Sequence, residues 1–367
     1  MSNKELRSGY TTGTHATAVF VASLYDYFEA KIVHDLFVQL PQNRGANIEV
    51  VREGVCHFST IKGDNDDMDV TKGCKISCQL LEHPPTDIKE QTPSLLEING
   101  TKVFIYAGEG VGVVTKKGLK IAPPHPAINP TPLEMMRENS KEIIKTSQGT
   151  LYALFCVANG EEIAKETANA KVGVLGGISI LGTRGIVKPV SASAYIDSIE
   201  AEINVALAQS QEYIVFTLGN SAYDYAKKHY NETSIIEIGN FVYDALVRLQ
   251  KHRVKRVIFI TSVAKMCKVA QGFKNTHNRY GSIDFTLVKE WLQSELGYAL
   301  GEEEFVTLKG VLQTLPEEYK DSFVKLLGVK SAYQFKKWFD EIELDIKEIV
   351  MTTLPNEISI IEKYHFF

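Results

Sequence analysis

Residues 213–230 read YIVFTLGNSAYDYAKKHY, and this stretch decides the fold class expected for the second half of the chain. A continuous apolar run is followed by a Gly-Asn turn and then by a segment with the spacing of an amphipathic helix. The same order of strand, turn and helix recurs at 235–249 and 256–270. Continuous apolar strands that alternate with amphipathic helices indicate a mainly parallel sheet covered on both faces. We therefore predict an α/β domain.

The Gly-Asn turn occurs twice, because residues 219–224 and 239–244 share the pattern Gly-Asn-x-x-Tyr-Asp. Asn220 and Asn240 each stand between a strand and a helix, where an asparagine side chain can cap the helix N-terminus. A second interpretation is open, because ligands of open α/β sheets bind at the carboxyl ends of the strands. The pattern thus predicts either two capped helices or part of a binding site.

The first half of the chain has β character after an opening helix that follows Thr11. Short strand-like segments between residues 35 and 114 are separated by turns such as Asn99-Gly100, which favours hairpins in an antiparallel or mixed sheet. A proline-rich crossing at 122–132 leads into another helix. We expect a β-rich α+β domain over 1–147 and an α/β domain over 148–367 whose C-terminal extension, beyond residue 290, is helical and serves packing.

Composition excludes several function classes. A net charge of −5 and a pI near 6.0 give no long-range attraction to nucleic acid or to an anionic membrane. The chain has no apolar run long enough to span a membrane and does not start like a signal peptide, so a cytoplasmic location is expected. The 5 cysteines are scattered and read as free thiols; Cys74 and Cys78 share a strand face without a second pair to complete a metal site.

Two stretches have the composition of ligand-binding loops. The segment 173–185, GVLGGISILGTRG, bares its backbone with glycines beside cations, which suits a bulky anionic ligand, although a purely structural loop is the alternative. The segment 271–282, QGFKNTHNRYGS, gathers many different hydrogen-bond donors, as a polar ligand would require. Neither matches a Walker loop or a Gly-x-Gly-x-x-Gly fingerprint, and the acidic run 63–73 lacks the ligand spacing of an EF-hand.

Together, eight segments resemble the CbiD family, the cobalt-precorrin-5B C(1)-methyltransferases of anaerobic cobalamin biosynthesis. They occur in the family's order: LRSGYTTGTHATA, GDNDDMDVTKG, GEGVGVVTKKGL, PAINPTPLEMM, GGISILGTRGIVKPVS, FTLGN, GNFVYDAL and AQGFKNTHNRYG. The resemblance implies methyl transfer from S-adenosylmethionine to C-1 of cobalt-precorrin-5B, giving cobalt-precorrin-6A. It implies a β-rich first domain and a Rossmann-like second domain. The tetrapyrrole substrate carries its own cobalt, so no protein-bound metal is expected. Contacts with neighbouring corrin-pathway enzymes and a homo-oligomer are left open.

The resemblance and the loop chemistry together select the candidate site residues. His277 is the first candidate for a general base, should the reaction use one, because an imidazole titrates near neutrality; Lys265 is the second catalytic candidate. Thr11, Thr12 and Gly13 stand at an expected helix N-terminus, which attracts anions. Lys274 and Arg279 are further cations for the substrate's carboxylates. The candidates for binding substrate or cofactor are Thr11, Thr12, Gly13, His15, Glu109, Gly110, Gly112, Asn129, Gly176, Gly177, Thr183, Arg184, Lys188, Gly219, Asn220, Gly239, Asn240, Asn275 and Thr276.

Two departures from the family pattern define the alternatives. His15 stands where the family usually has Cys, and the segment TSVAK carries Ser262 and Ala264 where the family usually has His and Gly, while Lys265 remains. A catalytically altered paralogue that binds a tetrapyrrole as a carrier or scaffold is therefore the runner-up. A nucleotide-dependent oxidoreductase has only fold analogy behind it and lacks the dinucleotide fingerprint.

Overall fold

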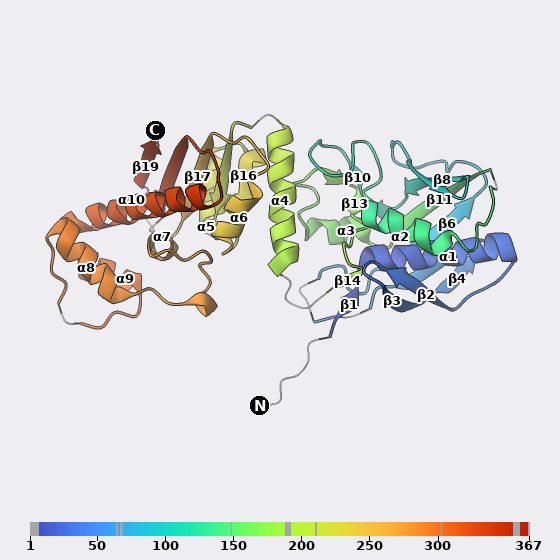
Figure 1. The fold of residues 1–367 in the computed structure, drawn as a ribbon, viewed down its shortest axis with the longest axis horizontal. Helices are drawn as coiled ribbons and strands as arrows, with labels where there is room; N and C mark the ends of the chain where they lie inside the picture. The colour runs from blue at the N-terminus through green and yellow to red at the C-terminus, as the bar shows by residue number, and fades with distance from the viewer. Residues whose placement is uncertain are drawn as a thin grey trace, which may run out of the picture. The chain divides into compact units, whose positions relative to one another are not determined.

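A computed structural model describes residues 7–63, 65–66, 69–147, 149–187, 192–209, 211–301 and 303–354, and the backbone alone over 360–365 (Figure 1). The chain is mixed α/β and divides into two compact units, Met1–Ser193 and Ala194–Phe367. Each unit has its own sheet and its own apolar core.

A six-stranded sheet organises the first unit. Its order is β4 (Val51–Gly54), β5 (His57–Ile61), β6 (Lys75–Leu81), β11 (Thr150–Val157), β8 (Thr101–Ala107) and β7 (Ser94–Ile98). β11 runs parallel to β8, and the other neighbours are antiparallel. Asn99 and Gly100 both have positive φ in the two-residue turn from β7 to β8, as the sequence predicts for an Asn-Gly hairpin.

Two helices pack on the sheet. α1 (Thr12–Glu29) begins at the capping residue Thr11 and buries the length of its apolar face, including Phe20, whose ring centroid lies 6.2 Å from that of Phe155 in β11. α2 (Pro130–Ser140) starts directly after the proline-rich crossing and packs against α1. The opening helix expected from the sequence is therefore confirmed.

Short strands join distant parts of the first unit. β1 (Gly9–Tyr10) pairs with β14 (Ile186–Val187), β9 (Gly110–Val111) with β13 (Gly177–Ile178), and β10 (Val113–Val114) with β12 (Val174–Leu175). β2 (Asp35–Leu40) and β3 (Arg44–Glu49) instead form a local antiparallel hairpin. α3 (Gly160–Lys165) follows β11. Segments more than 60 residues apart in the chain are thereby held against one another.

The division between the units differs from the expected boundary at 147/148. β11 lies between β6 and β8, inside the sheet of the first unit, and β12 to β14 pair with strands from the first half of the chain. An apolar strand followed by a helix looks the same whether it starts a new sheet or completes an old one. The structure consequently separates the two units after Ser193, and residues 150–187 belong to the first.

The second unit is built on a five-stranded sheet of order β16 (Ile235–Glu237), β15 (Tyr213–Thr217), β17 (Arg256–Thr261), β18 (Glu348–Thr353) and β19 (Ile360–His365). The first four strands are parallel, and β19 runs antiparallel to β18. Alternate residues of these strands face opposite sides of the sheet, so β15 gives Ile214 and Phe216 to one core and Val215 to the other.

Helices cover both faces of this sheet. α4 (Ala192–Ala208), α6 (Val242–Arg248), α7 (Val263–Ala270) and α10 (Glu317–Glu341) contribute to the larger core, and α5 (Asn220–His229) contributes Ala222 and Ala226 to the smaller one. α8 (Phe285–Leu296) and α9 (Leu308–Thr314) precede α10. The C-terminal part is helical as expected up to residue 341, but β18 then enters the sheet beside β17, so this part completes the fold rather than only packing on it.

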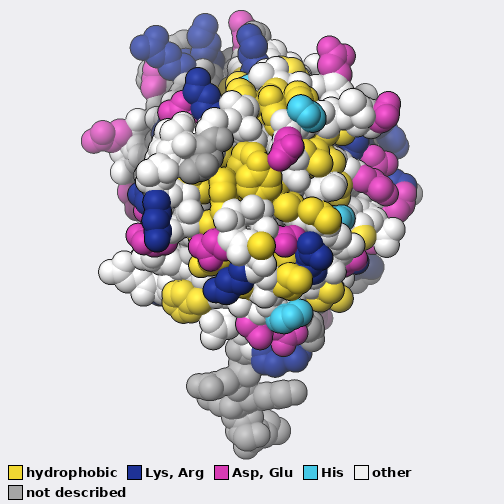
Figure 2. All heavy atoms as spheres, turned by 90° about the vertical axis from the view of Figure 1, so that its right-hand side faces the viewer, with side chains coloured by type: hydrophobic (Ala, Val, Ile, Leu, Met, Phe, Trp, Pro, Cys, Tyr) yellow, Lys and Arg dark blue, Asp and Glu magenta, His cyan; other side chains and the backbone are white. Residues whose placement is uncertain are grey.

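The surface of the first unit is not uniformly polar. Phe37, Val55 and Ile61 are among its exposed large apolar side chains, and Figure 2 shows apolar side chains gathered near the centre of one face. None of the helices in the described part of the chain is long and apolar enough to cross a membrane. Exposed apolar side chains occur at many places in the chain, so their exposure does not identify a functional site.

Candidate functional site

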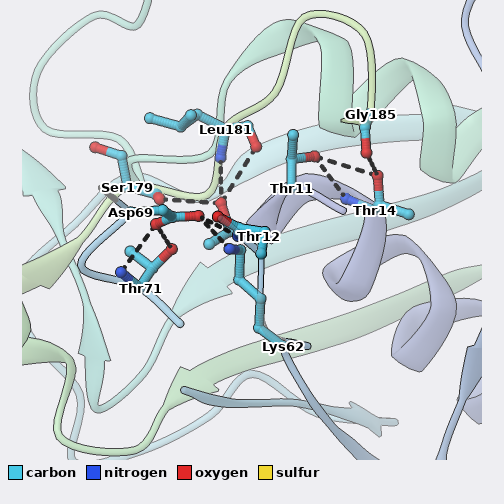
Figure 3. Close-up of polar contacts among 10 residues, drawn as sticks. Thr11, Thr12, Thr14, Lys62, Asp69, Thr71, Ser179, Leu181 and Gly185 are labelled. Atoms are coloured by element: carbon cyan, nitrogen blue, oxygen red, sulfur yellow. Dashed lines mark hydrogen bonds and ion pairs between the residues drawn. The ribbon is translucent and has the colours of Figure 1, made fainter. Parts of the chain in front are cut away.

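In the first unit, the start of α1 is bonded to the loop formed by residues 179–185 (Figure 3). The Thr12 hydroxyl donates to the carbonyl oxygens of Leu181 at 3.2 Å and Ser179 at 3.4 Å, and it accepts from the Leu181 N–H at 2.9 Å. The Thr14 hydroxyl donates to the Gly185 oxygen at 2.8 Å, and the Thr11 N–H to the same oxygen at 3.0 Å. This helix N-terminus, expected to attract an anion, is instead occupied by the protein's own backbone.

Glycines of the segments 108–118 and 173–185 allow the backbones of β9 and β13 to lie in close contact. Gly110 and Gly177 are direct partners in the β9–β13 pair. A Cβ at Gly110 would lie 1.9 Å from the Val157 oxygen, and one at Gly177 would lie 2.2 Å from the Gly110 backbone. Gly112 is confined in the same way by Gly177 and Val174. Here the close approach that glycine permits is made by another part of the chain.

The acidic run 63–73 contributes a buried ion pair that sequence reasoning did not select. Lys62, 1% exposed, pairs with Asp69, whose carboxylate also accepts from the Thr71 N–H at 2.9 Å (Figure 3). Burial alone would raise the pKa of Asp69, but the hydrogen bonds from Lys62 and Thr71 outweigh it and hold the pKa below its ordinary value. The Asn65 amide donates to the same Asp69 carboxylate at 3.4 Å, and the Asn65 side chain lies against Gly9.

His15 lies in α1 and is only 4% exposed. The Thr60 hydroxyl donates to the Glu49 oxygen at 2.7 Å, so it accepts from His15 Nδ1 at 3.2 Å, which leaves the proton on Nδ1 and a lone pair on Nε2. Nε2 is buried without a hydrogen-bond partner among the described residues. Burial, and then the charge of Lys62, lower the pKa of His15 to about 4. The residue that departs from the family pattern is therefore a neutral core histidine.

Other candidates of the first unit divide by exposure. Thr183 and Arg184 form the exposed tip of the 179–185 loop, and Glu109 is also exposed. Gly176 stands next to the Lys89 side chain. Asn129 precedes α2 and donates its N–H to the Ile180 oxygen at 2.9 Å, with no side-chain cap. Lys188 lies outside the described residues.

The structure thus brings five sequence motifs of the first unit together. The 179–185 loop contacts the start of α1 and the 126–129 crossing through backbone hydrogen bonds, among them Ile180 N–H to the Ala127 oxygen. Directly before the loop, β13 pairs with β9 and accepts the Gly112 N–H at the Ile178 oxygen. The acidic run joins them through Asn65 beside Gly9. Most polar groups of these segments form hydrogen bonds with one another. The exposed polar side chains Thr183 and Arg184 lie at the tip of the loop.

In the second unit, the candidates gather at the carboxyl ends of the parallel strands. Gly219 follows β15 with φ of +92°, and no atom lies within 4 Å of where its Cβ would be. Asn220 is the first residue of α5 and is exposed; it makes no side-chain cap. Ser262, exposed as well, follows β17 at the start of α7 and also makes no side-chain cap. These side chains are available to a ligand.

Asn240 does not cap a helix either, because Phe241 occupies the N-cap position of α6. The Thr276 hydroxyl donates to Asn240 Oδ1 at 2.8 Å, and the Thr276 N–H donates to the Asn240 oxygen at 3.1 Å. Gly239 has φ of +55° and packs on the Tyr195 ring. The capping interpretation is therefore wrong for both asparagines, and Asn240 instead joins the loop that carries Asn275 and His277.

His277 is exposed and starts a short 3-10 turn, Asn278–Tyr280. Its Nδ1 accepts the Arg279 N–H at 3.1 Å. In the neutral ring the proton then resides on Nε2, so the outward-facing nitrogen is a donor. The lone pair that a general base needs is engaged by the backbone, and this geometry favours hydrogen-bond donation by His277 over proton abstraction.

Lys265 lies half-buried in the first turn of α7. Burial, and then the neighbouring charge of Lys268, lower its pKa. Among the described residues, no carboxylate pairs with its ammonium group. Lys274, by contrast, pairs with Glu341 at 2.7 Å and lies over the Tyr243 ring, so its charge is already matched. The unmatched cation of Lys265 makes this edge attractive to an anionic ligand.

Sequence reasoning missed three residues that build these regions. Lys62 and Lys268 are 1% and 6% exposed. Lys268 stands in the mainly apolar stretch VAKMCKVA, and a charged residue in such a stretch is the signal that could have found it. Tyr195 donates its hydroxyl to the Glu237 oxygen at 3.1 Å at the end of β16. Burial, and then Glu237, raise the pKa of Tyr195 to about 12. No sequence motif marks it.

The fold and the clustered motifs define a two-unit mixed α/β protein with polar loops at the carboxyl edge of its parallel strands. The sequence model of the CbiD family matches residues 1–189. The chain belongs to the CbiD family.

Curated relatives resemble most of the chain, and each carries the name cobalt-precorrin-5B C(1)-methyltransferase. The protein of Citrifermentans bemidjiense is 35% identical over 80% of this chain and 81% of its own length. That of Priestia megaterium is 36% identical over 78% and 76%, and that of a Thermoanaerobacter species is 31% identical over 98% and 93%. The crystal structure of the cobalamin biosynthesis protein cbiD from Archaeoglobus fulgidus is 27% identical, with 69% of this chain and 76% of that one covered and a TM-score of 0.38.

Proposed function

We propose that this chain transfers a methyl group from S-adenosylmethionine to C-1 of cobalt-precorrin-5B, giving cobalt-precorrin-6A in anaerobic cobalamin biosynthesis. The observation that carries the proposal is the 31–36% identity, over 78–98% of the chain, to relatives named for this methyl transfer. The family's pathway would also make neighbouring corrin enzymes the natural contacts of the chain.

The methyl donor is assigned to the carboxyl edge of the second unit, which we propose is the Rossmann-like domain. Numbered along the chain from β15, the strands have the order 2-1-3-4-5, and in doubly wound sheets of this order the ligand lies where the order reverses. That point falls between β15 and β17. Gly219 and Asn220 after β15, and Ser262 after β17, offer an open turn and uncommitted polar side chains that fit the hydroxyl, amine and carboxylate groups of the donor.

The carboxylates of the tetrapyrrole need cations that are not already paired. Arg184 in the first unit and Arg279 in the second are exposed, and no salt bridge joins either to another described residue. Lys265 is also unmatched, whereas Lys274 is engaged by Glu341. Within the second unit, the proposal therefore gives Arg279 and Lys265 the larger share in carboxylate binding.

S-adenosylmethionine supplies an already activated methyl group, so the work left to the chain is alignment and exclusion of water. Holding two reactants in line is worth up to about 7–11 kcal/mol in well-oriented systems. The 272–281 loop would contribute through Asn275 and the Nε2–H donor of His277. No residue of the described chain has to act as a base for this to hold.

Incubation of the purified protein with S-adenosylmethionine and cobalt-precorrin-5B tests the proposal. The expected result is a product heavier by one methyl group, formed more slowly by Lys265→Met. The matched control is Lys228→Met, which alters an exposed lysine in the last turn of α5 and should leave the rate unchanged. Absence of methylated product from the wild-type protein, with bound corrinoid recovered intact, would contradict the proposal.

That same outcome would support the second candidate function, a tetrapyrrole-binding paralogue that acts as a carrier or scaffold. The observation that favours it is the exposed position of Ser262 and Ala264 at the start of α7, where the family usually has His and Gly. The change at His15 does not favour it, because that side chain is buried in the core. Restoring Ser262→His and Ala264→Gly together should then create methyl transfer that the wild-type chain lacks.

A further inference from the structure

The loop of residues 272–281 closes around a buried lysine. Lys268, in α7, is 6% exposed, and its ammonium group donates to three oxygens of the loop: Thr276 O at 3.1 Å, Gly281 O at 3.0 Å and Asn278 Oδ1 at 2.8 Å. It also lies 5.6 Å from the centroid of the Phe273 ring. All three acceptors are neutral oxygens that converge on one point.

The base of the loop is fastened separately. The Gln271 amide donates to the Asp284 oxygen at 2.8 Å, and the Asp284 N–H donates to Gln271 Oε1 at 3.0 Å. Between these residues the chain makes a compact loop of the kind that is packed by its own side chains. Gly281 has φ of +135°, and a Cβ there would lie 2.6 Å from the Phe273 ring. The loop therefore has a filled interior rather than a hollow one.

The polar side chains of the loop point to different sides. Thr276 is buried and bonded to Asn240, whereas Asn278, His277 and Arg279 are exposed. An ammonium group taken out of water loses hydration, and the three oxygens replace part of it. Among the described residues, no carboxylate pairs with Lys268, and the three loop oxygens are the acceptors of its ammonium group.

We propose that Lys268 is a positioning residue of the methyl transfer: its ammonium group holds the 272–281 loop in the arrangement that presents Asn275 and His277 to the methyl donor. This inference rests on the proposed function, since it assigns those two side chains to the donor. Lys268 itself does not touch substrate, and the family resemblance does not mark it.

Asn278 gives the sharpest test, because it is exposed and supplies one of the three oxygens. Asn278→Ala removes that oxygen, while Asn278→Asp keeps an oxygen at the same place and is the conservative control. Hydrogen–deuterium exchange of peptides that span 272–281 is expected to become roughly tenfold faster in Asn278→Ala, the effect of losing one hydrogen bond to a charged group. Asn278→Asp adds a negative charge that also pairs with the ammonium group, so it should keep at least wild-type protection.

Kinetics separates positioning from a merely structural role. Asn278→Ala is expected to raise KM for S-adenosylmethionine roughly tenfold while kcat stays close to that of the wild type, and Asn278→Asp should restore the wild-type KM. Lys268→Met removes all three bonds and should exceed Asn278→Ala in both exchange and KM. If Lys268→Met does not fold, the Asn278 pair decides.

Wild-type exchange and wild-type KM in Asn278→Ala would overturn the inference, as would equal effects of Asn278→Ala and Asn278→Asp. A wild-type protein that neither binds nor uses S-adenosylmethionine would remove the proposed function and, with it, the role of the loop toward a donor. Faster loop exchange in Asn278→Ala would then still show that Lys268 holds the loop, so the two failures are distinguishable.

Discussion

At the start of α1, the hydroxyls of Thr12 and Thr14 are buried and bonded to the 179–185 loop, whereas at the start of α5 the Asn220 side chain is exposed and makes no cap. Both places read alike in sequence, as glycine and a small polar residue before a helix. In the first unit such groups satisfy one another and join distant segments. In the second, Asn220 remains open at the edge of a parallel sheet, although Asn240 is satisfied by Thr276. The difference teaches that similar motif chemistry joins distant segments in one unit and leaves a polar side chain unsatisfied in the other.

The largest expected effect on stability comes from a substitution at Gly110, where β9 and β13 lie in close contact. Gly110→Ala places a Cβ 1.9 Å from the Val157 oxygen at a residue with φ of +69°. Backbone strain of about 1–3 kcal/mol adds to overpacking of a similar size, so the free energy of unfolding should fall by about 4 kcal/mol. Denaturant titration measures it. Gly54→Ala, whose Cβ would meet its nearest atom at 3.9 Å, is the control and should change little.

His15 adds a pH dependence to the same unit. Its pKa is about 4 in the folded protein against an ordinary value of 6.5, so between these pH values the unfolded chain binds a proton that the folded chain does not. The free energy of unfolding should therefore fall as the pH is lowered through this window, by up to about 3 kcal/mol. His15→Cys should flatten the dependence, whereas the exposed His34→Gln should leave it as in the wild type. An unchanged slope in His15→Cys would contradict the assignment.

Thr12 tests how far the contact between α1 and the 179–185 loop depends on one hydroxyl. Thr12→Val keeps the shape but leaves the Leu181 N–H without its 2.9 Å acceptor, at a cost of about 1–3 kcal/mol in the free energy of unfolding. Thr183→Val, at the exposed tip of the same loop, should cost less than about 0.5 kcal/mol. Equal losses for the two variants would mean that the contact does not depend on the hydroxyl.

Asn220 should give the smallest effect on stability and a distinct effect on binding. Because it makes no cap, Asn220→Ala is expected to change the free energy of unfolding by less than about 0.5 kcal/mol. Calorimetric titration with S-adenosylmethionine should nevertheless show roughly tenfold weaker binding, the loss of about one hydrogen bond. Asn231→Ala is the matched control, because Asn231 does cap, accepting the Thr233 N–H at 3.1 Å. That variant should lose stability and keep its affinity.

The sequence was a good guide wherever a local pattern had one structural outcome. The Asn99-Gly100 hairpin, the helix after Thr11 and the strand before Gly219 all follow from spacing and turn chemistry. The sequence was a poor guide where the structure of a segment depends on which distant segment it pairs with. β11 reads like the first strand of a new domain, yet hydrogen bonds with β6 and β8 place it in the first unit.

The site residues show the same contrast between local patterns and contacts with distant segments. The sequence predicts an anion site at Thr11, Thr12 and Gly13, but the carbonyl oxygens that accept from their donors come from residues 181 and 185. The Gly-Asn pattern favours a helix cap at Asn240, but the Asn240 side chain instead accepts from the hydroxyl of the loop residue Thr276. Lys62 and Lys268 escaped selection because their partners, Asp69 and the 276–281 oxygens, meet them only after folding.

By itself the sequence determined the mixed α/β class, the strand and helix pattern and the CbiD membership, since all of these depend on residue order within short segments. Only the tertiary structure decided which polar groups remain available. A hydroxyl or amide is open to a ligand when no other part of the chain satisfies it, and that depends on contacts between residues such as Thr12 and Leu181 that lie far apart in the sequence.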